Sequence, residues 1–421
     1  MNRFLHGHAT HPDPHMALAL AAAQIEAQRQ EPGHVHTPTL GWVYLTDEAA
    51  AHADGLLREL QQRWPGVDWV GASGVGIAAS GVEYFGEPAI SLMLTDLPRE
   101  QYQVFSGARP LGAFAAHTAQ VHADPGTGDL AELIHDMAAR TASGYLFGGL
   151  ASGAARTVHV AGAVLSGGLS GVAFGAGVAL VSRVSQGCQP AGPLRRITAA
   201  ERNVITALDG EPALDCLLRD AGVEGAEPRA ALPRLRQFLV GLVDAPVAGK
   251  GDAQQVLRRG AFGAETRVRH LIGLDAGRRG IAISDVAEAG MQLAFCTRDV
   301  EAARRDLVRI CAEVREEVEP ETWLLADALA QRAGAPDAPS LAAAPGAVAG
   351  AVSGPDPGPI AGAVYVSCAG RGGAHFGGAS AELAIVRHAL GDVPLVGFFA
   401  AGEIAHANLY GYTGVLTVFR A

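Results

Sequence analysis

Lysine and clustered positive charge are nearly missing from this chain. Lys250 is its only lysine, and 32 Lys and Arg residues stand against 43 Asp and Glu, which gives a net charge of −11. Binding to nucleic acid or to an anionic membrane requires a basic surface, so we expect neither partner. No apolar stretch is long enough, and free enough of glycine and polar residues, to span a bilayer. We therefore expect no membrane insertion.

Paired cysteines and a secretion signal are missing as well. The first thirty residues contain no basic segment followed by an apolar core, so they do not resemble a signal peptide. The cysteines are widely spaced, odd in number and without a CxxC pair: Cys188, Cys216, Cys296, Cys311 and Cys368. This pattern predicts neither a disulfide framework nor a zinc site, and it is typical of a reducing compartment. We expect a cytoplasmic protein.

Apolar residues and glycine are abundant. The chain has 421 residues, of which 49% are hydrophobic and 18% charged, enough for two domains with large cores. Its 54 glycines lie within apolar segments and follow no triplet repeat, which excludes collagen and favours strands joined by tight turns.

Helical and strand patterns alternate along the chain. The first half predicts helices over residues 16–30, 48–64 and 129–142, with strands over 41–47, 68–73, 81–96, 145–150 and 158–184. The second half predicts strands over 270–296, 393–399 and 412–419, with helices over 300–318 and 380–391. A helix, a short strand, a glycine and a longer strand recur in four copies, the loosest being 270–296, which indicates internal duplication.

These elements predict an α+β fold of two related domains, with mainly antiparallel sheets covered by helices. We expect an N-terminal helical, His-rich segment (residues 1–37) and two domains over residues 38–233 and 234–421. Residues 221–233 are rich in Gly, Pro and Glu and predict an exposed link between the halves. Residues 334–359 consist mainly of Ala, Gly, Pro and Ser and predict a flexible insertion.

The C-terminal sixty residues carry a series of motifs in a fixed order. A strand ending in Ser-Cys is followed by Gly-Arg-Gly, a helix with Glu, a Pro-Leu-x-Gly-Phe-Phe-x-x-Gly-Glu-Ile segment and a Gly-Tyr-Thr strand. These are Ser367-Cys368, Gly370-Arg371-Gly372, Glu382, Pro394 to Ile404, and Gly411-Tyr412-Thr413. This series resembles the end of the FIST C-terminal domain. It departs from the pattern at Tyr410, where relatives often have histidine.

The first half resembles the FIST N-terminal domain. The motifs that carry this resemblance are Trp69 to Ser73, Gly148 to Gly153, Gly167 to Val172, Gln186 to Pro190, Asn203 to Ile205 and Leu208 to Gly210. The resemblance implies a bacterial sensory protein that binds a small molecule, with amino acids or other small carboxylates as favoured ligands. Relatives occur beside kinase, cyclase or chemoreceptor output domains. Because this sequence has no such segment, we expect a separate signalling partner such as a kinase or cyclase.

The strand-end loop over residues 367–372 is the main candidate binding element. An irregular glycine loop can direct backbone N–H groups at an anion, and Arg371 adds a planar fork suited to a carboxylate. The alternative is a sharp turn in which Arg371 pairs structurally with Glu382 or Glu403, because buried charge must be compensated. The predicted ligand-binding residues are Ser367, Cys368, Gly370, Arg371, Gly372, Glu382, Phe399, Gly402, Glu403 and Tyr412.

Two other functions stay open. A thiol-dependent enzyme would use Cys368, but nucleophilic catalysis needs an adjacent base, and neither His375 nor His388 forms a known catalytic signature with it. We therefore predict no catalytic residue and no enzyme. A haem-based nitric-oxide sensor is the second alternative, because some relatives resemble such sensors; its axial ligand could be His159, His270, His375 or His406. Apart from that alternative, no cofactor is predicted.

The N-terminal histidines are a candidate metal site that we do not favour. Clustered histidines can bind metal. Here His6, His8, His11 and His15 lack acidic or thiol partners at ligand spacing, so a solvated segment is the prediction, with no metal site.

Overall fold

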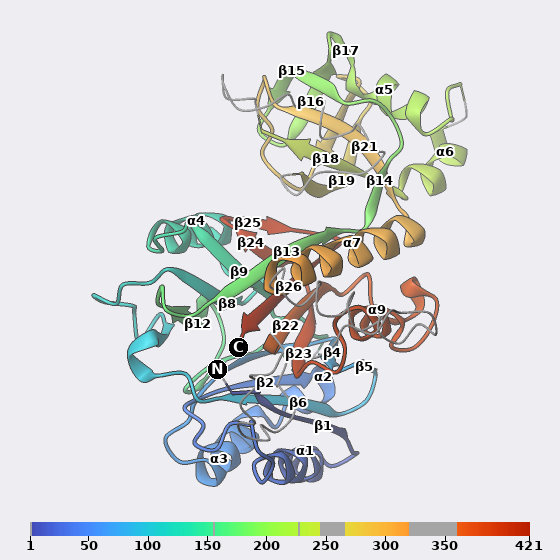
Figure 1. The fold of residues 1–421 in the computed structure, drawn as a ribbon. Helices are drawn as coiled ribbons and strands as arrows, with labels where there is room; N and C mark the ends of the chain where they lie inside the picture. The colour runs from blue at the N-terminus through green and yellow to red at the C-terminus, as the bar shows by residue number, and fades with distance from the viewer. Residues whose placement is uncertain (1, 155, 226–227, 245–265, 320–359) are drawn as a thin grey trace, which may run out of the picture.

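The computed structural model describes residues 2–154, 156–225, 228–244, 266–319 and 360–421 (Figure 1). Figure 1 shows a large body and a smaller lobe set apart at the top. The lobe comprises residues 188–298, from β14 to β21, and the described residues before and after it form the body. The predicted insertion over residues 334–359 lies outside the described residues.

Three sheets of six strands build the body. In the first sheet the order is β1-β6-β2-β3-β10-β11, with the bounds Leu5–Thr10, Ala89–Thr95, Leu40–Thr46, Asp68–Gly74, His159–Ala161 and Val164–Leu165. Helices α1 (Pro14–Gln28), α2 (Asp47–Ala50) and α3 (Ala53–Arg63) belong to this part of the chain. The predicted helix over residues 48–64 is thus two helices.

The second and third sheets both combine strands from the two ends of the chain. The second has the order β25-β24-β9-β8-β12-β7, with the bounds Asn408–Tyr410, Glu403–His406, Tyr145–Leu150, Thr118–Ala123, Leu169–Phe174 and Tyr102–Ser106. The third has the order β13-β26-β22-β23-β4-β5, with the bounds Leu180–Gln186, Thr413–Arg420, Ile360–Cys368, Leu395–Ala400, Gly76–Ala79 and Val82–Phe85. In both sheets, strands from before residue 233 pair with strands from after it. The domain boundary predicted between residues 233 and 234 stays a prediction.

Each sheet of the body contains one parallel strand pair, and in each pair a helix connects the two strands. The pairs are β2–β3 with α3, β8–β9 with α4 (Leu130–Ala139), and β22–β23 with α9 (Ala381–Leu390). A Cβ on Gly71, Gly148 or Gly397 would lie 1.7, 1.9 or 1.7 Å from the partner strand's carbonyl oxygen at Val43, Val121 or Tyr365. Only glycine fits such close approaches. A glycine in close contact with the partner strand thus recurs at equivalent positions of three strand–helix–strand units, in agreement with the predicted repeat.

The lobe does not contain the copy of this unit that was predicted there. Residues 270–296, predicted as the loosest copy, form only antiparallel pairs there. The strands β15, β16, β20, β19, β18 and β21 pair in this order, and β21 pairs with β15 again, so they form a closed ring. The bounds of the lobe strands are Cys188–Pro190 (β14), Arg195–Glu201 (β15), Val204–Leu208 (β16), Glu211–Pro212 (β17), Phe238–Val243 (β18), Arg267–Asp275 (β19), Gly280–Ile283 (β20) and Gln292–Arg298 (β21).

Helices α5 (Ala213–Asp220) and α6 (Pro228–Leu235) belong to the lobe. The described residues of 221–233, predicted as an exposed link between halves, lie inside the lobe and do not link it to the body. Most of them are exposed as predicted, but Ala221 and Ala231 are buried, and Pro228 begins α6. Helix α7 (Val300–Val318) returns the chain to the body and lies along β13 (Figure 1).

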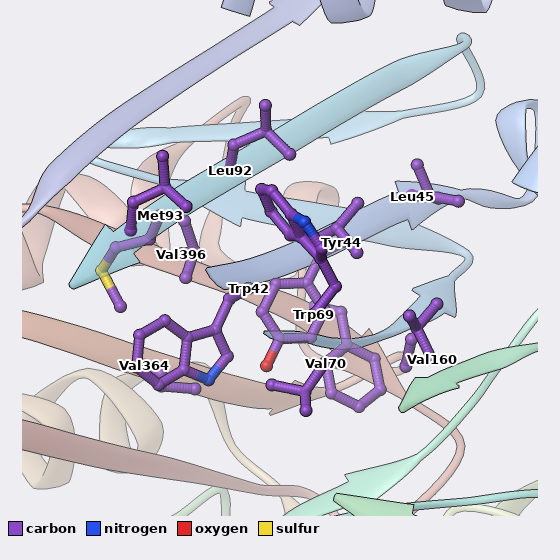
Figure 2. Packing of buried hydrophobic residues seen from close by; sticks show 14 of the residues in the cluster. Trp42, Tyr44, Leu45, Trp69, Val70, Leu92, Met93, Val160, Val364 and Val396 are labelled. Atoms are coloured by element: carbon purple, nitrogen blue, oxygen red, sulfur yellow. The ribbon is translucent and has the colours of Figure 1, made fainter. Parts of the chain in front are cut away.

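The largest core lies between the first sheet and the strands that face it (Figure 2). Trp42, Tyr44 and Trp69 are fully buried, and Figure 2 shows Trp42 beside Val364 of β22. Val396 of β23 belongs to the same cluster. The Tyr44 ring stacks on Phe398, with centroids 5.2 Å apart. Burying one such side chain contributes about 1.5–3 kcal/mol. The N-terminal and C-terminal regions are therefore held in one core.

The histidine-rich start is not wholly the solvated segment that was predicted: it forms β1 and the first turn of α1, with His6 and His8 half-buried and His15 exposed. His6 and His8 lie in β1, which pairs with β6 in the first sheet. Burial lowers the pKa of His6 to about 4, with smaller contributions from His8 and Arg3. The histidines of β1 are partly buried because this strand pairs with residues 89–94, and the local sequence cannot indicate such a distant partner.

Candidate functional site at the junction of body and lobe

The predicted binding loop lies at one end of the third sheet. Parallel strands end at the same edge of a sheet, so β22 and β23 bring residues 367–372 and 401–403 together. The loop closes through a hydrogen bond from the Arg371 N–H to the Cys368 carbonyl, 2.8 Å. Ser367 is buried, Cys368 is half-buried and Gly370 is exposed. The motifs that carried the resemblance thus surround one place.

Arg371 and Glu382 form an ion pair that is wholly buried. Arg371 Nε and Nη2 lie 3.1 and 3.0 Å from Glu382 Oε1, and both side chains have zero exposure. Glu382 also accepts hydrogen bonds from the hydroxyl groups of Tyr365 (2.6 Å) and Ser367 (2.9 Å). Such a pair is tolerated in a core because each charge is compensated and hydrogen-bonded. This is the structural pairing that the sequence left as an alternative.

Glu83 and Phe85 of β5 complete this cluster, and sequence reasoning missed both. The Glu83 carboxylate accepts hydrogen bonds from the N–H groups of Gly373 (3.0 Å), Glu382 (3.0 Å) and Leu383 (3.1 Å). It therefore caps the start of α9, where a negative charge is favourable. The Phe85 ring lies 4.5 Å from Phe399. No local signal could show this, because residue 83 is about three hundred positions away.

Glu403 is a second buried carboxylate, next to Cys368. Its Oε2 accepts hydrogen bonds from the Thr413 N–H (3.0 Å) and hydroxyl (2.6 Å). Burial raises the pKa of Glu403 to about 7, although Thr413 and Arg371 act in the opposite direction. Burial, followed by the Glu403 charge, also raises the pKa of the Cys368 thiol well above its ordinary value. The thiol is therefore protonated at neutral pH.

Tyr412 connects this cluster to the lobe. From the body, Arg371 Nη1 donates to the Tyr412 carbonyl (3.4 Å) and to the Ser185 carbonyl (3.1 Å). From the lobe, Arg298 donates to the Tyr412 hydroxyl and lies 3.9 Å above its ring, and His270 Nε2 is 3.1 Å from the same hydroxyl. The backbone of Tyr412 has a φ of +59°, a left-handed conformation that is costly for a tyrosine. Arg298 was not among the predicted site residues.

The structure brings all the predicted site residues to this junction but does not leave them equally accessible. The side chains of Arg371, Glu382, Phe399 and Glu403 have zero exposure. Gly402 is buried, and a Cβ on Gly372 would lie 2.3 Å from the Phe85 ring. Direct ligand contact therefore stays a prediction for these residues.

The candidate axial histidines for haem are placed differently from one another. The ring nitrogens of His159 lie 2.6 Å from the Ser170 hydroxyl and 3.1 Å from the Gly167 carbonyl, so both are engaged. His270 faces Tyr412, and His406 packs edge-on against Tyr145, 4.7 Å between centroids. The fourth candidate, His375, is half-buried and packs edge-on against Phe376, 5.8 Å between centroids. Haem binding stays a prediction.

Comparison with known proteins agrees with the motifs at this junction. The FIST N domain matches residues 39–211, and the FIST C domain matches residues 213–406. The chain belongs to the FIST family. FIST domains are associated with the sensing of small ligands in signal transduction. None of the helices in the described ranges combines the length and apolar character needed to cross a membrane.

Relatives of this FIST protein extend along its whole length. It is 30% identical over 434 residues to "Uncharacterized protein Rv0628c" of Mycobacterium tuberculosis, with 98% of each chain covered. It is also 30% identical over 433 residues to "Uncharacterized protein Mb0898c" of Mycobacterium bovis, with 98% of this chain and 97% of the relative covered. The similarity thus spans both matched domains and nearly the whole length of each relative.

Proposed function

We propose that this FIST protein is a cytoplasmic sensor that binds a small molecule where the lobe meets the body. The ligand would be an amino acid or another small carboxylate, and a separate protein such as a kinase or cyclase would receive the signal. The observation that carries the proposal is the position of Tyr412, which contacts Arg298 and His270 of the lobe and Arg371 of the body.

The connections between the two parts suit a conformational response. The chain passes between body and lobe at residues 186–188 and 298–300. Besides the polar contacts of Tyr412, the Gln186 amide donates to the Thr266 carbonyl at 3.1 Å. Tyr412 also packs in an apolar cluster with Leu239, Val268 and Cys296 of the lobe. A ligand that prefers one arrangement of lobe and body shifts the population toward it. The strained backbone of Tyr412 is a further feature expected at such a place.

The proposal does not include catalysis. The raised pKa of Cys368 favours the thiol over the thiolate, and only the thiolate is a good nucleophile. The charged groups with the largest effects on its pKa are Glu403, Arg371 and Arg298, and none of these is the histidine base that a cysteine nucleophile requires.

The test uses the full chain with a panel of amino acids, small carboxylates and haem. A ligand that binds the native state raises the melting temperature. We expect the same ligand to slow hydrogen exchange at residues 186–188 and 298–300. Tyr412→Phe removes the hydroxyl that contacts Arg298 and His270, and we expect it to reduce this slowing.

The matched control is Tyr84→Phe, since the Tyr84 hydroxyl bonds His8 at 2.7 Å within the body. It should leave the response unchanged. A ligand that stabilises the protein without altering exchange at either connection would contradict the sensor proposal, and a Soret band after haem loading would favour the haem alternative.

A further inference from the structure

The lobe carries a cavity of about 400 Å³ close to Tyr412. Its walls come from the end of α6 and from β18, β19 and β21. Three of the lining residues are arginines, and three others offer polar atoms: Arg234, Arg236, Arg298, Gln237, His270 and Thr297. Arg298 and His270 are also the residues that contact the Tyr412 hydroxyl. The cavity and the junction therefore share two side chains.

The arginines of this cavity lack the carboxylate partners that several other arginines of the lobe have. Arg267 and Arg269, on β19, each pair with a carboxylate at 2.7 Å, those of Asp244 and Asp285. By contrast, within the described ranges no carboxylate lies in ion-pairing distance of Arg234, Arg236 or Arg298. Arg234 bonds the Gln237 amide oxygen (3.2 Å) and lies over the Phe238 ring.

The three guanidinium groups around this cavity repel one another. They form a local concentration of positive charge in a chain whose net charge is −11. Elsewhere in the lobe, carboxylates neutralise arginines such as Arg267 and Arg269. Guanidinium forks bind carboxylate and phosphate oxygens with matching geometry, and a doubly charged anion satisfies more than one fork at once. The volume of the cavity exceeds that of a single inorganic ion, so it accommodates a small organic molecule.

We infer that this cavity binds a small organic anion with two negative charges, a dicarboxylate or a phosphate monoester. This anion would also be the ligand of the sensor, and that second part rests on the proposed function. Binding would reach the body through Arg298, whose guanidinium both lines the cavity and lies over the Tyr412 ring. An anion drawing Arg298 toward the cavity would weaken its contact with Tyr412.

Titration calorimetry on the full chain tests the anion site. The probes are glutarate, glycerol phosphate and inorganic phosphate, with acetate as the singly charged control and ionic strength held constant with chloride. We expect saturable binding of glutarate or glycerol phosphate and no saturation with acetate. The comparison of the first two probes decides between a dicarboxylate and a phosphate monoester.

Arg236→Ala should weaken this binding at least about ten-fold, the usual effect of losing a charge-assisted hydrogen bond. The matched control is Arg196→Ala, which removes an equal charge from an exposed position on β15 of the same lobe and should leave the affinity within about two-fold. Equal losses in the two variants, or equal binding of acetate and the dianions, would overturn the inference because they indicate unspecific attraction.

Hydrogen exchange separates this inference from the proposed function. If a dianion binds in an Arg236-dependent manner but exchange at residues 186–188 and 298–300 is unchanged, the anion site stands and the sensor proposal fails. If an amino acid alters that exchange equally in the wild type and in Arg236→Ala, the sensor proposal stands and the inference that the anion is its ligand is wrong.

Discussion

Two arginines approach Tyr412 from opposite sides, and they differ in how their charge is neutralised. Arg371, in the body, is fully buried and is paired with Glu382 at 3.0 Å. Arg298, in the lobe, is exposed, and its partner is the neutral Tyr412 hydroxyl. A charge compensated within the protein contributes to structure, whereas a charge left uncompensated beside a cavity is available to a ligand. Arg371 therefore stabilises the fold of the body, whereas Arg298 is positioned to bind a ligand.

The strongest test of this comparison is Arg371→Ala. The substitution leaves Glu382 buried without its cationic partner, so we expect a loss of about 3–5 kcal/mol in the free energy of unfolding. Chemical denaturation measures it. The paired variant Arg298→Ala should lose less than about 1 kcal/mol, since it removes one hydrogen bond at the surface. Similar losses in the two variants would contradict the distinction between a structural and an available arginine.

The second test concerns the buried carboxylate of Glu403. Its pKa is about 7 in the folded protein and has an ordinary value of 4.5, so between these values the folded state holds a proton that the unfolded state has released. The free energy of unfolding should therefore fall as the pH rises from about 4.5 to about 7, with Glu403 contributing up to about 3 kcal/mol of this decrease.

Glu403→Gln should remove this contribution, because glutamine does not titrate. Denaturation curves at pH 5 and pH 7.5 give the decrease for the wild type and for the variant, and the difference between the two decreases is the effect of Glu403. An equal pH dependence in both proteins would show that Glu403 is ionised throughout this range, as a carboxylate balanced by Arg371 would be.

The smallest expected effect is that of Arg236→Ala on stability. Arg236 is exposed, and its nearest charges in the cavity are positive, so the free energy of unfolding should change by less than about 0.5 kcal/mol. Thermal or chemical denaturation in chloride buffer without other anions measures it. A loss above 2 kcal/mol would mean that Arg236 supports the fold of the lobe, and its effect on anion binding would then have a structural cause.

Much of the secondary structure could be predicted from local patterns. The helix predicted over residues 16–30 is α1 (Pro14–Gln28), displaced by two residues because the Asp13 side chain caps it at the His15 N–H and Pro14 begins it. The helix over residues 300–318 is α7 (Val300–Val318), with Asp299 as its cap. The prediction of an α+β fold with mainly antiparallel sheets was also confirmed. Capping and amphipathic spacing act within a few residues, so they are visible in the sequence.

The pairing of strands from the two ends of the chain could not be predicted from the sequence. Strand β24 of the second half pairs with β9 of the first, and β23 pairs with β4. Backbone hydrogen bonds carry no residue-specific signal, so the sequence does not record which distant strand is the partner. For the same reason the residues of β5 that reach the Arg371–Glu382 pair, and the lobe arginines around the cavity, could not be predicted.

The sequence by itself determined the family, the type of fold and the loop of residues 367–372, because motif order and local periodicity are properties of the chain alone. Only the tertiary structure decided what each charged group does. Arg371 and Arg298 look alike in sequence, but burial beside Glu382 neutralises the first, whereas its place at the edge of a cavity leaves the second free of a carboxylate partner within the described ranges. The physical reason is that electrostatic compensation depends on distance and burial, which arise only when segments far apart in the chain pack together.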